Sequence, residues 1–191
     1  EYNKSFIIIG NTNAITYKET FGLIKENKLR TGYTNFNVGM FFVVPDHWKK
    51  FHHIDDNGKK IARVSTSCWF TNMEVKKHKE DLILYKTYKG NEQDYPKYDN
   101  YDAIEVSQVA NIPMDYAGHM GVPITFVDKY NPDQFEIIGF THRNDPYDLK
   151  TKIYTKADGD NFNDLNGSPI IIENGQAKFI YMRIIIKNKK L

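Results

Sequence analysis

The chain has 191 residues and a mass of 22.3 kDa, and 40% of its residues are hydrophobic, 14% aromatic and 26% charged. Disordered chains are poor in aromatic residues, so this composition excludes one. A formal net charge of +2 is too small to indicate nucleic-acid or membrane binding by itself, and no apolar run approaches the ~20 residues of a membrane span.

The single cysteine, Cys68, excludes an internal disulfide and a cysteine-rich zinc site, and it favours a reducing cytoplasm. The chain starts at Glu1 and runs directly into apolar residues, with no initiator methionine and no signal-peptide pattern. We therefore expect a piece of a longer cytoplasmic protein.

The first elements predict half of a βαβ unit. Residues 5–9 form a continuous apolar run that ends at Gly10, which is typical of a buried strand in a parallel sheet covered by helices on both faces. Thr16 and Glu19 match a capping box and predict a helix that ends near Asn27. Such a unit cannot fold alone, which again favours a longer protein.

Residues 37–71 predict one long hairpin, with strands at 37–44 and 60–71 and a turn at 55–58. Its tip is basic and aromatic, and we predict that it contacts phosphates through Lys49, Lys50, His52 and His53. An ordinary exposed turn is the alternative. A metal site is disfavoured, because no cysteine or second acidic residue stands at a ligand spacing from these histidines.

The character of the sequence changes near residue 75, where we expect the boundary between two parts of the chain. Further strands are predicted at 82–88, 121–126 and 134–140, loops at 89–102 and 142–165, and a closing hairpin from 169–172 and 178–186. Two segments, beginning at Asn131 and Asn144, resemble the Asn-Pro-Pro-aromatic motif of enzymes that methylate a base amino group. Each has a single proline, so both are interpreted as turns.

Two other sites are excluded by spacing. The acidic stretch 158–167 has the apolar Phe162 where a calcium loop needs an oxygen ligand. A glycine-rich nucleotide loop after a strand is also absent, since the Gly118–Gly121 segment is too short and misplaced. No catalytic residue and no metal ligand is assigned.

Several specific strings resemble the EcoRI-type family of DNA adenine-specific methyltransferases. They stand at residues 8–11, 13–19, 68–72, 95–102, 120–126 and 128–136, the longest being Met-Gly-Val-Pro-Ile-Thr-Phe and the segment Asp-Lys-Tyr-Asn-Pro-Asp-Gln-Phe-Glu that follows it. The resemblance implies a bacterial restriction–modification enzyme that transfers a methyl group from S-adenosylmethionine to adenine in a short site of double-stranded DNA.

The resemblance also implies an incomplete enzyme. Family members carry a glycine-containing cofactor loop and an Asn-Pro-Pro-Phe motif upstream of the segment that matches Glu1, and neither is present. We therefore expect an α/β fold: the C-terminal part of a Rossmann-like methyltransferase sheet in residues 1–75, and a β-rich target-recognition region with a C-terminal hairpin in residues 76–191. S-adenosylmethionine is expected to bind the full-length enzyme and not this chain alone, and a missing N-terminal catalytic half is a possible partner.

Within this family pattern, Trp69, Phe70 and Asn72 resemble the hairpin motif that lines the target-base pocket, where an aromatic ring stacks on an extruded adenine. Trp69 and Phe70 as plain core residues are the alternative. A basic run around His78 is expected to contact the DNA backbone through Lys76, Lys77 and Lys79. Two other functions stay open: a stand-alone DNA-binding specificity module that pairs with a separate catalytic chain, and a fragment of a restriction nuclease.

Overall fold

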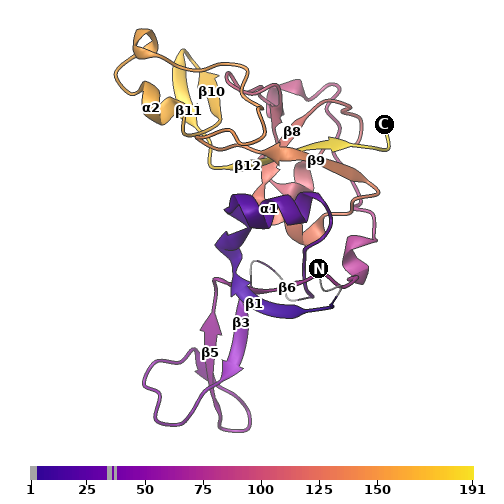
Figure 1. Ribbon diagram of the computed structural model, residues 1–191, viewed down its shortest axis with the longest axis vertical. Coiled ribbons are helices and arrows are strands. Elements are labelled where there is room, and N and C mark those ends of the chain that lie inside the picture. Colours follow the sequence, from indigo (N-terminus) through magenta and orange to yellow (C-terminus); the bar gives the residue numbers. More distant parts are fainter. Residues whose placement is uncertain (1–3, 34–35, 37) are drawn as a thin grey trace. The chain divides into compact units, whose positions relative to one another are not determined.

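The computed structural model describes residues 4–33, 36 and 38–191, which form a mixed α/β protein with several small sheets and few helices (Figure 1). Residues 1–77 and 78–191 form two compact units. No helix in the described part of the chain is long and apolar enough to cross a membrane.

Unit 1 contains a three-stranded antiparallel sheet in the order β1-β6-β2. Its strands are β1 (Ile7–Asn11), β6 (Ser67–Thr71) and β2 (Arg30–Thr31). The prediction that the first strand is buried in a parallel sheet is therefore wrong. β1 is an edge strand, and Ile7, Ile8 and Ile9 are 58%, 51% and 51% exposed. The apolar run predicted a strand correctly, but it could not show how little covers that strand.

The predicted helix is confirmed as α1 (Lys18–Lys25), which buries Phe21 and Ile24 on one face. The predicted capping box is wrong. Thr16 ends a preceding 3-10 helix (Thr12–Thr16), and its hydroxyl donates to the carbonyl oxygen of Asn13 over 2.8 Å instead of capping α1. The helix ends where Asn27 takes a positive φ of 56°, a conformation that asparagine tolerates better than most residues.

The predicted long hairpin divides into two sheets. A second antiparallel sheet of unit 1 has the order β3-β5-β4, from β3 (Met40–Val43), β5 (Lys60–Val64) and β4 (His53–Ile54). The predicted turn is confirmed, because Gly58 donates to the carbonyl oxygen of Asp55 and has a φ of +76°. After β5 the chain leaves this sheet and enters β6 of the first sheet. The predicted first residue of the hairpin, Asn37, lies outside the described residues.

Unit 2 is built on a four-stranded sheet in the order β7-β8-β12-β9. Its strands are β7 (Ile104–Glu105), β8 (Met120–Pro123), β12 (Arg183–Asn188) and β9 (Phe135–Phe140), and β7 with β8 is the one parallel pair of strands within the described residues. The consecutive isoleucines Ile184, Ile185 and Ile186 are all buried, so both faces of the central strand β12 are covered.

The predicted strand at 134–140 is confirmed by β9, while the one at 121–126 is right only in its first half, because a 3-10 helix (Ile124–Lys129) follows β8. Residues 82–88 join no sheet; Lys86 makes one isolated bridge with Pro113. The closing hairpin is confirmed as β10 (Ile170–Glu173) and β11 (Gln176–Phe179), but the chain beyond it separates into β12.

The loop predicted at 142–165 contains two short turns of helix, a 3-10 helix (Lys156–Asp158) and α2 (Phe162–Leu165). The turn predicted at Asn131 is confirmed. Its side-chain oxygen accepts from the backbone N–H of Asp133 over 2.9 Å, and its amide nitrogen donates to Asp81 over 3.0 Å. Asn131 is buried, and its side chain takes part in this turn.

Candidate functional site

The aromatic residues Trp69 and Phe70 are neighbours on strand β6, and their side chains lie on opposite faces of the sheet. Successive side chains of a strand point to opposite faces, and the two faces differ here. Phe70 is 2% exposed, and a Cβ added at Gly10 on β1 would lie 2.9 Å from its ring, so Phe70 fills the core. Trp69 is half-buried and lines a pocket on the other face.

This pocket has a volume of about 390 Å³ and is largely apolar, which is a normal size for a small-molecule site. We call it the Trp69 pocket. Its lining comes from β1, from β6 with the turn after it, and from the segment that follows β2: Ile7, Gly32, Tyr33, Trp69, Thr71, Met73, Glu74 and Val75. All of these residues belong to unit 1.

Hydrogen bonds fix the wall around Trp69. The N–H of Gly32 donates to the carbonyl oxygen of Trp69 over 2.8 Å. The hydroxyl of Thr71 donates to the carbonyl oxygen of Phe6 over 2.6 Å and accepts from the N–H of Met73 over 3.0 Å. The end of β6 and the turn after it are therefore held in one conformation.

Asn72 lies beside the pocket but does not line it. Its amide oxygen accepts from the N–H of Phe6 over 2.9 Å, and its amide nitrogen donates to the carbonyl oxygen of Lys4 over 2.9 Å. Both polar ends of the side chain thus bind the backbone that leads into β1. Of the three residues predicted for a base pocket, the structure places Trp69 in a pocket, Phe70 in the core and Asn72 on this backbone.

Sequence reasoning missed Tyr33, Glu74 and Ile7 as pocket residues. Tyr33 is far from Trp69 in sequence and reaches the pocket because β2 pairs with β6. Its hydroxyl accepts from the N–H of Lys76 over 3.2 Å. No local motif marks Tyr33 as a pocket residue. Its place beside Trp69 follows from the pairing of Thr31 with Phe70, which the sequence did not predict.

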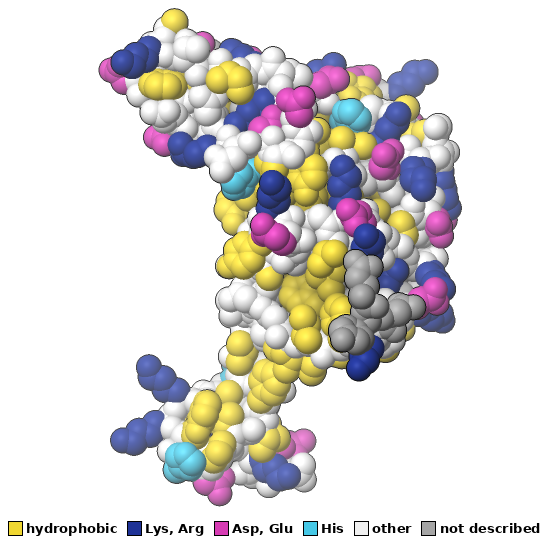
Figure 2. All heavy atoms as spheres, in the orientation of Figure 1, with side chains coloured by type: hydrophobic (Ala, Val, Ile, Leu, Met, Phe, Trp, Pro, Cys, Tyr) yellow, Lys and Arg dark blue, Asp and Glu magenta, His cyan; other side chains and the backbone are white. Residues whose placement is uncertain are grey.

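The four residues predicted at the hairpin tip, Lys49, Lys50, His52 and His53, are all exposed. The Nδ1 atoms of His52 and His53 lie 2.8 Å apart, and both rings contact the ring of Phe41, at 5.5 Å and 6.3 Å between centroids. In Figure 2, Lys and Arg side chains and hydrophobic side chains share the surface over the strands that Figure 1 labels β3 and β5. Basic side chains and the ring of Phe41 thus share this surface, with acidic side chains beside them.

The four residues of the basic run 76–79 differ in their exposure to solvent. Lys76 and Lys79 are exposed and Lys77 is half-buried. His78 is buried, and its Nδ1 lies 2.8 Å from the carbonyl oxygen of Tyr130. Lys76 and Lys77 belong to unit 1, and His78 and Lys79 belong to unit 2.

A family model described as adenine-specific methyltransferase EcoRI matches residues 1–189. The chain belongs to this family. It is 44% identical over 194 residues to the type II methyltransferase M.EcoRI of Escherichia coli, a match that covers 100% of this chain and 52% of that protein. Two further type II methyltransferases match over the whole chain: M.MgeORF184P of Mycoplasma genitalium (36% identical, 59% of its length) and M.MpnI of Mycoplasma pneumoniae (35% identical, 58% of its length).

The chain therefore spans about half the length of the curated relatives it matches. Relatives named type II methyltransferases are enzymes. No solved structure matches the chain.

The methyltransferase family implies S-adenosylmethionine, but the described residues do not fit a glycine-loop site for it. Such a site needs a glycine between a strand and a helix, where the backbone can approach the ligand closely. Gly10 comes nearest to this place, but it lies inside β1, two residues before the first 3-10 helix, and a Cβ added to it would lie 2.9 Å from the ring of Phe70. No group of three or more His, Cys, Asp or Glu residues in the described part of the chain could hold a metal ion.

Proposed function

We propose that this chain is part of a DNA adenine methyltransferase of a restriction–modification system, and that the Trp69 pocket receives the target base. The enzyme would act in the cytoplasm on double-stranded DNA. The observation that carries the proposal is the position of Trp69: an aromatic side chain, half-buried, lining an apolar pocket of about 390 Å³ in a chain of this family.

An extruded base loses its stacking inside the duplex, and a flat apolar side chain restores part of it. Trp69 offers such a surface, and Tyr33 supplies a second aromatic side chain to the same pocket. Glu74 is the one carboxylate that lines it. A carboxylate accepts hydrogen bonds, as the exocyclic amino group of adenine requires. S-adenosylmethionine, when bound to the whole enzyme, supplies the methyl group.

The basic residues are proposed to hold the DNA backbone. Lysine and histidine side chains neutralise phosphates without reading sequence. This role goes to Lys49, Lys50, His52, His53, Lys76, Lys77 and Lys79.

The exposed edge of β1 supports a further part of the proposal. An edge strand with Ile7, Ile8 and Ile9 exposed is a template for pairing with another strand. We place residues 1–75 at the C-terminal end of a catalytic methyltransferase domain, with β1 joining a Rossmann-like sheet supplied by the rest of the enzyme. Residues 76–191 form the target-recognition region.

The test uses the whole open reading frame that contains these 191 residues. The purified product is incubated with duplex DNA and methyl-labelled S-adenosylmethionine, and the modified base is identified by mass spectrometry. We expect N6-methyladenine. Methylated cytosine, or no labelled DNA from an enzyme that binds both substrates, would refute the assignment.

A further inference from the structure

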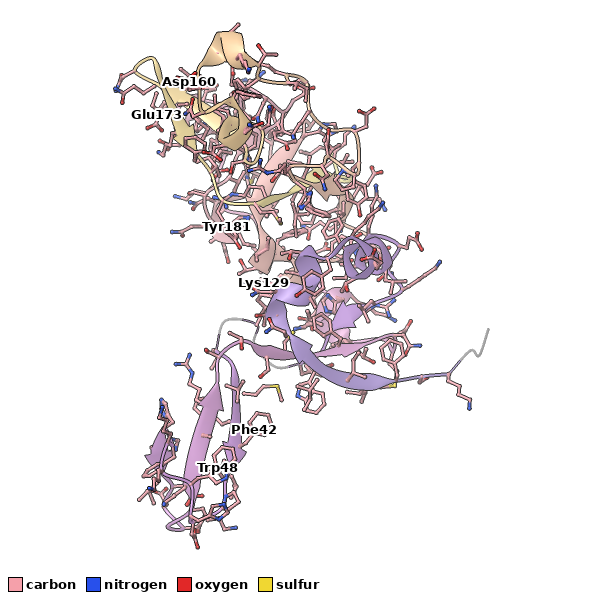
Figure 3. The ribbon with its side chains drawn as sticks, turned by 60° about the vertical axis from the view of Figure 1, so that its left-hand side comes forward. Phe42, Trp48, Lys129, Asp160, Glu173 and Tyr181 are labelled. Atoms are coloured by element: carbon pink, nitrogen blue, oxygen red, sulfur yellow. The ribbon has the colours of Figure 1, made fainter. Side chains whose placement is uncertain are left out.

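The sheet β3-β5-β4 carries a groove that the family assignment does not explain. The groove has a volume of about 360 Å³ and lies wholly within unit 1. Its lining joins the segment before β4 to β5 and the turn after it: Lys50, Phe51, His52, Ala62, Arg63 and Ser65. Figure 3 shows the sheet from another side, with Phe42 on β3 and Trp48 in the loop between β3 and β4.

The polar side chains that line the groove suit an anion. Lys50, His52 and Arg63 carry or can carry positive charge, Ser65 adds a hydroxyl donor, and no carboxylate is among the lining residues. In the turn at 55–58, the side chain of Asp55 binds the backbone of its own turn. The carboxylate of Asp55 accepts from the N–H groups of Asn57 and Lys59, at 3.0 and 2.8 Å, and the bond from Lys59 is the main cause that lowers the pKa of Asp55.

The groove is held in shape before any ligand arrives. The Nε of Arg63 donates to the carbonyl oxygen of Val38 over 2.9 Å, which fixes the guanidinium by one of its five N–H donors. The backbone N–H of His52 donates to the carbonyl oxygen of Ile61 over 2.6 Å, and its ring meets Phe41 edge to face. Phe51 is held by Lys60, whose Nζ lies 5.1 Å from the ring centroid.

We propose that this groove binds one phosphate group of the DNA backbone, with Arg63 as the principal contact and Lys50, His52 and Ser65 around it. The inference rests on the proposed function as a DNA enzyme, and it adds Arg63 and Ser65 to the DNA surface. An arginine fork matches two phosphate oxygens, and the remaining N–H donors of Arg63 are those that such a contact needs.

The salt dependence of DNA binding tests the proposal. The probe is a fluorescein-labelled random-sequence duplex, titrated with the chain between about 50 and 200 mM salt. The Arg63→Ala variant should lower the slope of log K against log salt by about 0.9 and weaken binding about fivefold to tenfold at 0.1 M salt, because one phosphate contact is lost. Arg63→Lys should keep the slope.

Lys28→Ala is the matched control. It also removes one positive charge from unit 1, but Lys28 pairs with Glu26 at 2.7 Å and does not line the groove. Its slope should equal that of the unchanged chain. If Arg63→Ala behaves like this control, with an unchanged melting temperature, the groove holds no phosphate and the proposed function survives. If the unchanged chain binds no duplex, the inference fails, and the methylation test of the whole open reading frame decides the proposed function separately.

A second arm identifies the source of the phosphate. Inorganic phosphate is titrated into the chain by calorimetry, and we expect no saturation at micromolar concentration, because the other backbone contacts are missing. Saturable micromolar binding that Arg63→Ala abolishes would assign the groove to a free phosphate ligand and overturn its assignment to DNA.

Discussion

The position of the Trp69 side chain requires a glycine at residue 32. A Cβ added at Gly32 would lie 2.8 Å from the Cβ of Trp69, closer than real Cβ atoms approach, while the backbone N–H of Gly32 binds the carbonyl oxygen of Trp69. A glycine at this position therefore lets β2 close against Trp69 and shape the pocket.

Gly32→Ala should displace the indole ring of Trp69. Overpacking of this kind typically costs about 1–3 kcal/mol, so the melting temperature should fall and the tryptophan emission spectrum should shift. Gly58→Ala serves as a comparison. No atom lies near an added Cβ at Gly58, whose cost comes from its positive φ alone. It should lower stability without moving the emission of Trp69, and an unchanged spectrum in Gly32→Ala would refute the dependence.

Breaking the buried ion pair between Arg183 and Glu105 should destabilise unit 2. Arg183 binds both carboxylate oxygens of Glu105, with Nη2 at 2.6 Å, and the two side chains are 13% and 7% exposed. The hydroxyl of Tyr98 donates to the same carboxylate, and burial is the main cause that raises the pKa of Tyr98.

Arg183→Met leaves the charge of Glu105 buried without its partner, which typically costs about 3–5 kcal/mol. The control is Lys178→Ala in the exposed pair with Glu173, which should cost less than about 1 kcal/mol. Urea denaturation compares the two variants. Equal free energies of unfolding would show that the Glu105 pair contributes no more than a surface pair. Glu105→Leu combined with Arg183→Met should recover part of the loss.

Asp99 should make unit 2 less stable in acid. Its carboxylate accepts from Lys152 and Tyr154, both at 2.6 Å, and these bonds, that from Lys152 first, hold its pKa below the usual 3.8. The contribution is complete above the unfolded pKa and is lost as the pH falls through the lower folded pKa. Asp99→Asn should therefore destabilise the chain at about pH 7 and match the unchanged chain below both pKa values, in urea titrations at each pH. A difference that is independent of pH would mean that the ionised form of Asp99 is not favoured by folding.

The tip lysines should act on DNA affinity without affecting sequence preference. Lys49→Ala with Lys50→Ala should lower the salt slope of duplex binding by about two units, since each lysine releases about one counterion. Selection from a random duplex library before and after the change measures preference. An unchanged slope would make the tip an ordinary exposed turn, and an altered motif would make it a base-reading element.

Local signals in the sequence predicted local structure. The Asn174–Gly175 turn closes β10 and β11, with both residues at positive φ, as two-residue hairpins require. The alternation of Trp69 and Phe70 across a strand was also predictable. Which of the two meets the core was not, because that depends on the elements that cover each face of the sheet.

The pairing of the strands was the part of the fold that the sequence predicted least well. β12 enters the sheet between β8 and β9, which precede it by more than forty residues, and nothing in its isoleucines specifies these neighbours. The apolar run of β1 has the composition of a buried strand, yet the strand lies at an edge. The composition of a strand shows that its side chains are suited to burial, but the neighbouring strands and covering elements determine whether they are buried.

The central claim is that Trp69 stacks on the target base while Phe70 is a core residue. The most direct measurement compares Trp69→Ala and Phe70→Ala in the whole enzyme, with methylation rates of the folded fraction measured beside thermal melts. Stacking is typically worth about 1–3 kcal/mol per base, so Trp69→Ala should slow methylation roughly ten- to a hundredfold with cofactor binding intact, and Trp69→Phe should restore much of the rate. Phe70→Ala should instead cost about 3–5 kcal/mol of stability. Equal losses of melting temperature in both alanine variants, with methylation by the folded fraction unchanged, would contradict the assignment of the Trp69 pocket.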